Sequence, residues 1–240
     1  MTWWSIFSKT RKLDAALVNA SGDGRLAPVQ QLLAQGANPN AKKFGGHTAL
    51  MAAAEHGHCE VIELLVKSGA LIDAQKAFGF TALMLASAAG HVNAVHTLVR
   101  LGAAVNARKD GGETPLTTSV WRGRYETAEA LLYCGADVNQ TKDGAVTALM
   151  IAAQRGDERI VRLLLGAGAL VNAREDNYGW TPLMSAAAFG RDSIVRLLVA
   201  HGADLNARAN DGATALSLAQ QSNHTSIAAL LKEQALRLHP

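Results

Sequence analysis

The feature that most constrains this chain is an internal repeat. A tripeptide, Thr-Ala-Leu or Thr-Pro-Leu, recurs with spacings of 33, 33, 33, 34 and 33 residues, starting at Thr48, Thr81, Thr114, Thr147, Thr181 and Thr214. A Gly-Ala pair keeps the same period, at Gly36, Gly69, Gly102, Gly135, Gly168 and Gly202. Such a period is typical of stacked helical units, none of which buries its apolar face alone. The repeat therefore predicts an all-α solenoid.

Each unit is predicted to be a helix, a turn and a second helix. In one unit, Thr147 can cap the first helix, and Gly156 stands where that helix would end in the left-handed region. Residues 157–165 carry apolar side chains at helical spacing, and Gly168 ends this second helix. Residues 171–180 are polar and rich in turn-forming residues, so we expect a loop before the next threonine.

This pattern resembles the ankyrin repeat, from about residue 12 to the end of the chain. Besides the threonine starts, the resemblance rests on Gly-Ala-Asp-Val-Asn at 135–139 and on the mid-repeat glycines Gly57, Gly90, Gly123, Gly156 and Gly190. It implies an ankyrin-repeat solenoid of stacked helix-turn-helix units with protruding loops or β-hairpin tips, in about seven repeats including two caps.

The chain departs from the family at one position. The family usually has histidine after Thr-Pro-Leu, whereas the residues here are Met51, Met84, Thr117, Met150, Met184 and Ser217. We expect the methionines to fill the core, so that thioether packing replaces a ladder of histidine hydrogen bonds between repeats.

The repeats also define the domain organisation. Residues 1–12 form a tail of aromatic and basic residues, and residues 13–240 form a single ankyrin-repeat domain. Its units are an N-terminal capping repeat at 13–46, full repeats at 47–79, 80–112, 113–145, 146–179 and 180–212, and a C-terminal capping repeat at 213–240. In the last repeat Asn223 replaces the mid-repeat glycine, because asparagine tolerates the left-handed conformation. Both terminal repeats are polar, so we expect a complete array.

Composition excludes several classes of protein. Hydrophobic residues make up 49% of the chain, which is too many for intrinsic disorder. The longest run without polar side chains, residues 163–171, is far shorter than the roughly 18 residues of a transmembrane helix. The N-terminus places apolar before basic residues, the reverse of a secretory signal. Two cysteines, Cys59 and Cys134, in no CxxC pattern fit a reducing compartment, so we expect a cytoplasmic protein.

The residues predict no enzyme, cofactor or metal site. The cluster His47, His56, His58 and Cys59 raises a zinc hypothesis, but His58 occupies a position that belongs to the repeat. Cys59 and Cys134 lie about two repeats apart, too far for a disulfide. Isolated Gly-x-Gly matches lack the preceding strand that a phosphate-binding loop needs.

The resemblance implies a binding surface. In ankyrin-like repeats, the loop tip, the residue before the threonine and the end of the first helix line a concave face that recognises partners. The matching candidates are Phe44, His47, His56, Phe78, Phe80, Glu113, Trp121, Arg122, Arg155, Tyr178, Trp180 and Phe189. Aromatic residues and arginine dominate interface energies. The chain is therefore predicted to be a monomeric, non-catalytic scaffold or adaptor for a protein partner; the alternative is that the rings only stiffen their own loops.

One loop of this face differs in length. Nine steps separate Asn172 from Thr181, one more than in the other repeats, which we expect to push Tyr178 outward.

A second function remains open, namely binding of nucleic acid or an acidic lipid surface. It would use a row of basic loop residues, which are Lys42, Lys43, Lys76, Arg108, Lys109, Lys142, Arg174 and Arg208. Acidic residues interleave with this basic row, and the formal net charge is only +3, so ordinary solvated turns are favoured over a nucleic-acid track. The N-terminal Trp3, Trp4, Ile6 and Phe7 would either contact a membrane interface or cap the first repeat, and we favour the cap.

Overall fold

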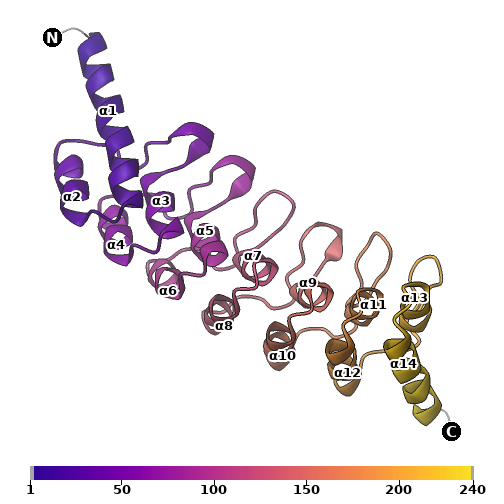
Figure 1. Ribbon diagram of the computed structural model, residues 1–240. Helices are drawn as coiled ribbons and strands as arrows, with labels where there is room; N and C mark the ends of the chain where they lie inside the picture. The colour runs from indigo at the N-terminus through magenta and orange to yellow at the C-terminus, as the bar shows by residue number, and fades with distance from the viewer. Residues whose placement is uncertain (1–2, 239–240) are drawn as a thin grey trace. The chain divides into compact units, whose positions relative to one another are not determined.

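The computed structural model describes residues 3–238, with the side chains of residues 10–43 and 45–236, and its regular elements are helices (Figure 1). The first helices of the repeats are α1 (Trp3–Gly22), α3 (Ala49–Glu55), α5 (Ala82–Ala89), α7 (Pro115–Trp121), α9 (Ala148–Arg155), α11 (Pro182–Ala188) and α13 (Ala215–Gln221). The second helices are α2 (Leu26–Ala34), α4 (Cys59–Lys67), α6 (Val92–Arg100), α8 (Tyr125–Tyr133), α10 (Glu158–Gly166), α12 (Asp192–Ala200) and α14 (Thr225–Leu238). The predicted all-α fold of helix-turn-helix units is confirmed.

The loops between repeats are compact turns. Three of them contain a short 3-10 helix, η1 (Phe44–Gly46), η2 (Ala77–Gly79) and η3 (Asp143–Ala145). Within residues 3–238 there is no named strand, and the β-pairing is one isolated antiparallel bridge between Lys142 and Val146. The tips are therefore loops rather than extended β-hairpins.

The helices belong to two compact units, which we describe separately. Unit 1 comprises Met1–Ser119 and Glu126–Ala136, and unit 2 comprises Val120–Tyr125 and Asp137–Pro240. In unit 1, α3 packs on α1 and α5, while α4 packs on α2 and α6. In unit 2, α11 packs on α9 and α13, while α12 packs on α10 and α14. Within each unit, first helices thus stack on first helices and second helices on second helices.

Threonine caps the first helix in each repeat from α3 to α13, as the sequence predicts. Its Oγ1 accepts a hydrogen bond of 3.1 to 3.3 Å from the N–H three residues later, in the pairs Thr48–Met51, Thr81–Met84, Thr114–Thr117, Thr147–Met150, Thr181–Met184 and Thr214–Ser217. The left-handed conformation predicted for Asn223 is also confirmed, with φ of 59°. The repeat boundaries thus follow from local capping chemistry.

The residue after Thr-Ala/Pro-Leu packs in the core in the repeats from α3 to α11, whereas Ser217 in the last repeat is exposed. The methionines at this position are buried, which confirms their predicted role: Met51, Met84, Met150 and Met184. In the two repeats without methionine, the hydroxyl oxygen of Thr117 or Ser217 accepts a hydrogen bond of 2.8 Å from the N–H of the capping threonine. In the repeat of α9 the Met150 sulfur accepts the corresponding N–H of Thr147 at 3.5 Å.

One set of hydrogen bonds between repeats comes from the turn that precedes a second helix. Side-chain N–H groups at this position donate to a backbone carbonyl of the preceding repeat: His58 to Gly22 at 2.9 Å, Arg191 to Gln154 at 3.1 Å and His224 to Ala188 at 3.2 Å. Histidine bonds between repeats are therefore present, at the turn instead of in the core. They lie at another position than the methionines that fill the core.

Asparagine side chains join the loops of successive repeats. In unit 2, Asn139 Nδ2 donates to the Gly168 carbonyl at 3.2 Å, and its Oδ1 accepts from the Leu170 N–H at 2.9 Å. In unit 1, Asn40 makes the same two bonds with Gly69 and Leu71. One amide thus satisfies both a donor and an acceptor of the next repeat.

Helix α1 begins at Trp3, so residues 3–12 are continuous with the first helix of the array. Leu17 and Val18 are buried, and α1 packs on α2 and α3. The side chains of Trp3, Trp4, Ile6 and Phe7 lie outside the described residues, so their predicted capping role stays a prediction. No helix in the described part of the chain has the length and hydropathy to cross a membrane.

Candidate protein-interaction surface

The predicted contact residues differ in how much of their side chains they expose. Four rings are strongly exposed, namely Phe78 (72%), Trp121 (51%), Tyr178 (68%) and Phe189 (44%). Arg122, Arg155 and His56 are exposed as well, whereas His47, Phe80, Glu113 and Trp180 are half-buried. The side chain of Phe44 lies outside the described residues. These four rings are thus at a loop tip or at the end of a first helix, as the resemblance implies.

In unit 2, Trp121 and Arg155 form a cation–π contact. They are the last residues of α7 and α9, and the guanidinium carbon lies 5.9 Å from the centroid of the indole ring. Both side chains are exposed, so a partner could contact the ring and the guanidinium together.

Unit 2 also has an open pocket of about 450 Å³, which we call the aromatic pocket. It is lined by Val146, Met150, Gln154, Glu175, Asn177, Tyr178, Trp180, Ser185 and Phe189. The rings of Tyr178 and Trp180 lie 6.1 Å apart at an interplanar angle of 50°. Tyr178, Trp180 and Phe189 were predicted as contact residues, whereas Met150 was predicted to fill the core. Apolar walls with a few polar groups suit an apolar side chain.

Glu175 organises the longer loop beside this pocket. One of its carboxylate oxygens accepts from the N–H groups of Tyr178 (2.7 Å) and Trp180 (3.0 Å), and the other accepts from Asn177 (2.7 Å). Three backbone donors thus meet one carboxylate, and Tyr178 projects outward from this turn with 68% of its side chain exposed. The added residue would otherwise leave these N–H groups without protein partners.

Glu175→Ala is expected to loosen this loop by about 1 kcal/mol, because the three N–H groups would have to bond to water. Amide hydrogen exchange should quicken at Asn177, Tyr178 and Trp180. Asp176→Ala is the matched control: it removes the same charge from the next residue, whose N–H bond to the Gly144 carbonyl (2.8 Å) is made by the backbone and remains. Equal exchange in the two variants would contradict the assigned role of Glu175.

In unit 1, two neighbouring rings differ in their surroundings. Phe80 lies against the ammonium groups of Lys76 and Lys109, at 5.7 and 4.5 Å from its centroid, and Lys109 pairs with Glu113 at 2.9 Å. Phe80 is therefore held between its own loop and the next one, and Glu113 is paired within its own loop. Phe78 instead stands exposed in η2 with φ of 64°, a conformation that L-residues with bulky side chains rarely adopt.

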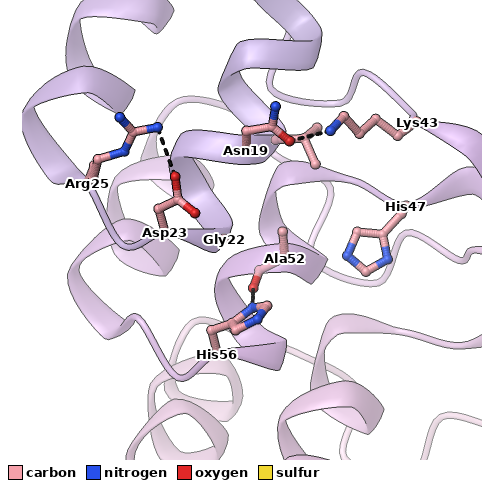
Figure 2. A pocket seen from close by; sticks show the side chains of 9 residues that line it. Asn19, Gly22, Asp23, Arg25, Lys43, His47, Ala52 and His56 are labelled. Atoms are coloured by element: carbon pink, nitrogen blue, oxygen red, sulfur yellow. Dashed lines mark hydrogen bonds and ion pairs between the residues drawn. The ribbon is translucent and has the colours of Figure 1, made fainter.

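Unit 1 contains a second open pocket, of about 920 Å³, which we call the polar pocket (Figure 2). It is lined by Val18, Asn19, Gly22, Asp23, Arg25, Lys43, His47, Ala52 and His56. Arg25 pairs with Asp23 at 2.8 Å, and Lys43 donates to Asn19 Oδ1. His56 Nδ1 donates to the Ala52 carbonyl at 2.9 Å. His47 and His56 were predicted as contact residues, but the contribution of α1 was not.

His47 lies between two opposite charges. Its Nδ1 is 3.5 Å from Lys76 Nζ, and its Nε2 is 3.6 Å from a Glu55 carboxylate oxygen. Burial, and then the positive charge of Lys76, lower the pKa of His47 below its ordinary value; Glu55 opposes them, and His56 and Lys43 lower this pKa further. His47 is therefore neutral at neutral pH.

Several members of the basic row are engaged within their own unit. Besides Lys43, Lys76 and Lys109, Arg208 donates to the Gly212 carbonyl at 3.3 Å. A phosphate track needs basic side chains that are free to follow a backbone. Basic side chains that are already bound within their own unit do not favour a phosphate track.

The histidine cluster that suggested zinc is used otherwise. The rings of His56 and His58 stack with centroids 6.1 Å apart, and each bonds to a backbone carbonyl. Among the described residues there is no group of three histidine, cysteine or acidic side chains placed to hold a metal.

Comparison with known proteins gives a family and a structural relative. A family model described as ankyrin repeats (3 copies) matches residues 7–76, 69–142 and 140–209. The crystal structure of the human ASB11 ankyrin repeat domain is similar, with a TM-score of 0.79 and 28% sequence identity over 90% of this chain and 96% of that chain. No curated protein sequence matches the chain.

Proposed function

Because the chain belongs to the ankyrin repeat family, whose repeats are generally protein–protein interaction modules, we propose that it is a non-catalytic adaptor that binds a protein partner. The contact surface in this proposal is the concave face of the repeats, with the exposed rings as its anchors.

The observation that carries the proposal is the aromatic pocket of unit 2. Tyr178 and Phe189 are exposed at its rim, and the half-buried Trp180 forms part of its wall. Large rings cost free energy when they face water, so a pocket bordered by them favours an apolar side chain from a partner. Trp121 and Arg155 would add a second anchor, because both are residue types enriched at interface hot spots.

The test compares capture of partners by the wild-type protein and by the double variant Trp121→Ala, Tyr178→Ala. Tyr178 is preferable to Trp180 because the Trp180 side chain is half-buried, so its loss would also disturb the loop. Proteins retained from a native extract are quantified by mass spectrometry, and the most enriched is purified for affinity measurement. We expect the helical circular dichroism to stay unchanged and the affinity to fall at least about tenfold.

Tyr133→Ala is the matched control. Tyr133 is 88% exposed but lies at the end of a second helix, α8, outside the predicted surface. Its replacement removes a ring that is more exposed than Trp121 or Tyr178 and should leave capture unchanged. Partner capture that survives in the double variant, or that is lost equally in the control, would move the binding surface elsewhere.

A further inference from the structure

We propose that the polar pocket of unit 1 binds a glutamate or aspartate side chain of an extended acidic peptide segment, with Lys43 as the charged anchor. This contact is distinct from the aromatic surface proposed above and does not depend on it. The residues that build it come from α1, from the turn after α1, from the loop before α3 and from α3 itself.

The lining residues leave one positive charge unmatched. Arg25 and Asp23 neutralise each other in an ion pair of 2.8 Å. Lys76 and Glu55, which do not line the pocket, lie on opposite sides of the neutral His47 ring and offset each other. Lys43 bonds to the Asn19 amide oxygen, which carries no charge, and no carboxylate among the described side chains forms an ion pair with it. The pocket therefore has a net charge near +1, which matches a single carboxylate.

Lys43 and Asn19 together offer donors to such a carboxylate. Figure 2 shows the Lys43 side chain extended toward Asn19, with the His47 ring beside it. An ammonium group has three N–H donors and the contact with Asn19 uses one of them, while the Asn19 Nδ2 group has two donors of its own. His56 uses its Nδ1 for the Ala52 carbonyl, so its other nitrogen is left for a peptide group.

Size and charge favour a peptide over a small anion. A volume of about 920 Å³ lies at the upper end of ligand pockets and far exceeds a single ion, so a side chain could enter with part of its backbone. The Asp23 carboxylate lines the same pocket and would repel a doubly charged phosphate monoester more strongly than a carboxylate. Arg25, which has the fork geometry that suits phosphate, is already paired.

The test is a titration of the ¹⁵N-labelled full chain with the peptide acetyl-Ala-Glu-Ala-Glu-Ala-amide, followed by NMR. Shift changes are expected to concentrate at Asn19, Lys43, His47 and His56, and the peptide with Gln in place of Glu should cause none. Lys43→Gln keeps a donor for Asn19 but removes the charge, and should weaken binding by about tenfold.

Lys142→Gln is the matched control, because Lys142 holds the same place in its loop. The N–H of Lys43 bonds to the His47 carbonyl at 2.9 Å, and that of Lys142 bonds to the Val146 carbonyl at 3.0 Å. Both variants lower the net charge equally, but Lys142→Gln should bind the peptide like the wild type. An equal loss in both would reduce the interaction to general attraction by a basic protein and overturn the proposal. If glutarate or inorganic phosphate bound as tightly as the peptide, the proposal that the pocket is occupied by a peptide would be wrong.

Binding should also depend on pH. A carboxylate near His47 favours its protonated form, so the pKa of His47 should be higher in the complex than in the free protein, where burial and Lys76 lower it. The complex then takes up protons, and affinity should rise as the pH falls from about 8 to 6. The ring resonances of His47 report this directly. The Trp121→Ala, Tyr178→Ala variant should show the same titration, which separates this proposal from the proposed function.

Discussion

Gly79→Ala is expected to lower the free energy of unfolding by about 2 to 3 kcal/mol, because two separate costs fall on one methyl group. Gly79 has φ of 76°, in the left-handed region, which costs an L-residue roughly 1 to 2 kcal/mol. The added Cβ would also lie 2.9 Å from Lys109 Cα and from the Asp110 nitrogen. These are backbone atoms of the next loop, so they cannot rotate away as the end of a side chain could.

Gly111→Ala separates the two costs. Gly111 has φ of 81°, but a Cβ there would meet no atom within 4 Å, so this variant carries the conformational cost alone. Urea unfolding followed by circular dichroism should give a loss of about 1 kcal/mol for Gly111→Ala and clearly more for Gly79→Ala. Parting the loops would also break the bond from the Asp110 N–H to the Phe78 carbonyl, 3.1 Å long, so exchange of that amide should quicken in Gly79→Ala only. Equal losses would mean that the two loops do not pack as described.

The sequence predicts those parts of the fold that depend on local chemistry. A threonine before Ala/Pro-Leu caps a helix wherever it occurs, because its oxygen reaches an N–H only three residues away. Glycine, or Asn223, at positive φ ends helices for a reason that is equally local. Because the same residues recur in each repeat, the same local structure is expected in each one. The helix order and the core methionines could therefore be predicted together.

The bonds between repeats could not be predicted in the same way. His58, Arg191 and His224 perform one task with different side chains, so the repeat marks the position but the residue type there does not show that it bonds to the preceding repeat. What they share is a side-chain N–H that can reach a carbonyl some 36 residues earlier. That reach depends on the packing of one repeat on the next, which exists only in the folded chain.

The candidate site also has parts that could be predicted from local sequence and parts that depend on packing between repeats. Exposure of Trp121 and Tyr178 could be predicted, because loop tips and helix ends follow from the repeat. The buried part of the lining of the aromatic pocket could not, since the pattern assigns Met150 to the core and singles out nothing at Ser185. The polar pocket was missed because Asn19 belongs to the degenerate first repeat and meets Lys43 across 24 residues of sequence.

Phe78 is the residue at which the local rules fail, and the failure points to binding. The same loop position holds Gly45, Gly111 and Gly144 in other repeats, with φ between 73° and 81°, whereas Phe78 has φ of 64°. A bulky residue in this conformation is strained. Because 72% of the Phe78 side chain is exposed, burial of the ring contributes little free energy to offset that strain. Backbone strain that no gain in folding stability offsets is expected where a side chain binds another molecule.

Phe78→Gly is therefore expected to change stability and binding in opposite directions. Relief of the left-handed strain, reduced by the backbone entropy of glycine, should raise the free energy of unfolding by about 0.5 to 1 kcal/mol. Affinity for the partner captured by the wild-type protein should fall at least about tenfold, if the ring is an interface anchor as proposed. Urea unfolding and calorimetric titration measure the two effects on one preparation.

Phe78→Asn shows whether the loss of affinity in Phe78→Gly comes from the missing ring or from the more flexible backbone. Asparagine tolerates positive φ, so it should relieve most of the strain without the entropy cost of glycine, and its lack of a ring should cost as much affinity as Phe78→Gly. If both variants are stabilised and both bind weakly, the ring itself makes the contact. If Phe78→Asn binds like the wild type, the ring is dispensable and flexibility introduced by glycine explains the loss. If neither variant is more stable, the strain at φ of 64° is absent in solution, and the physical reason for assigning Phe78 to the interface disappears with it.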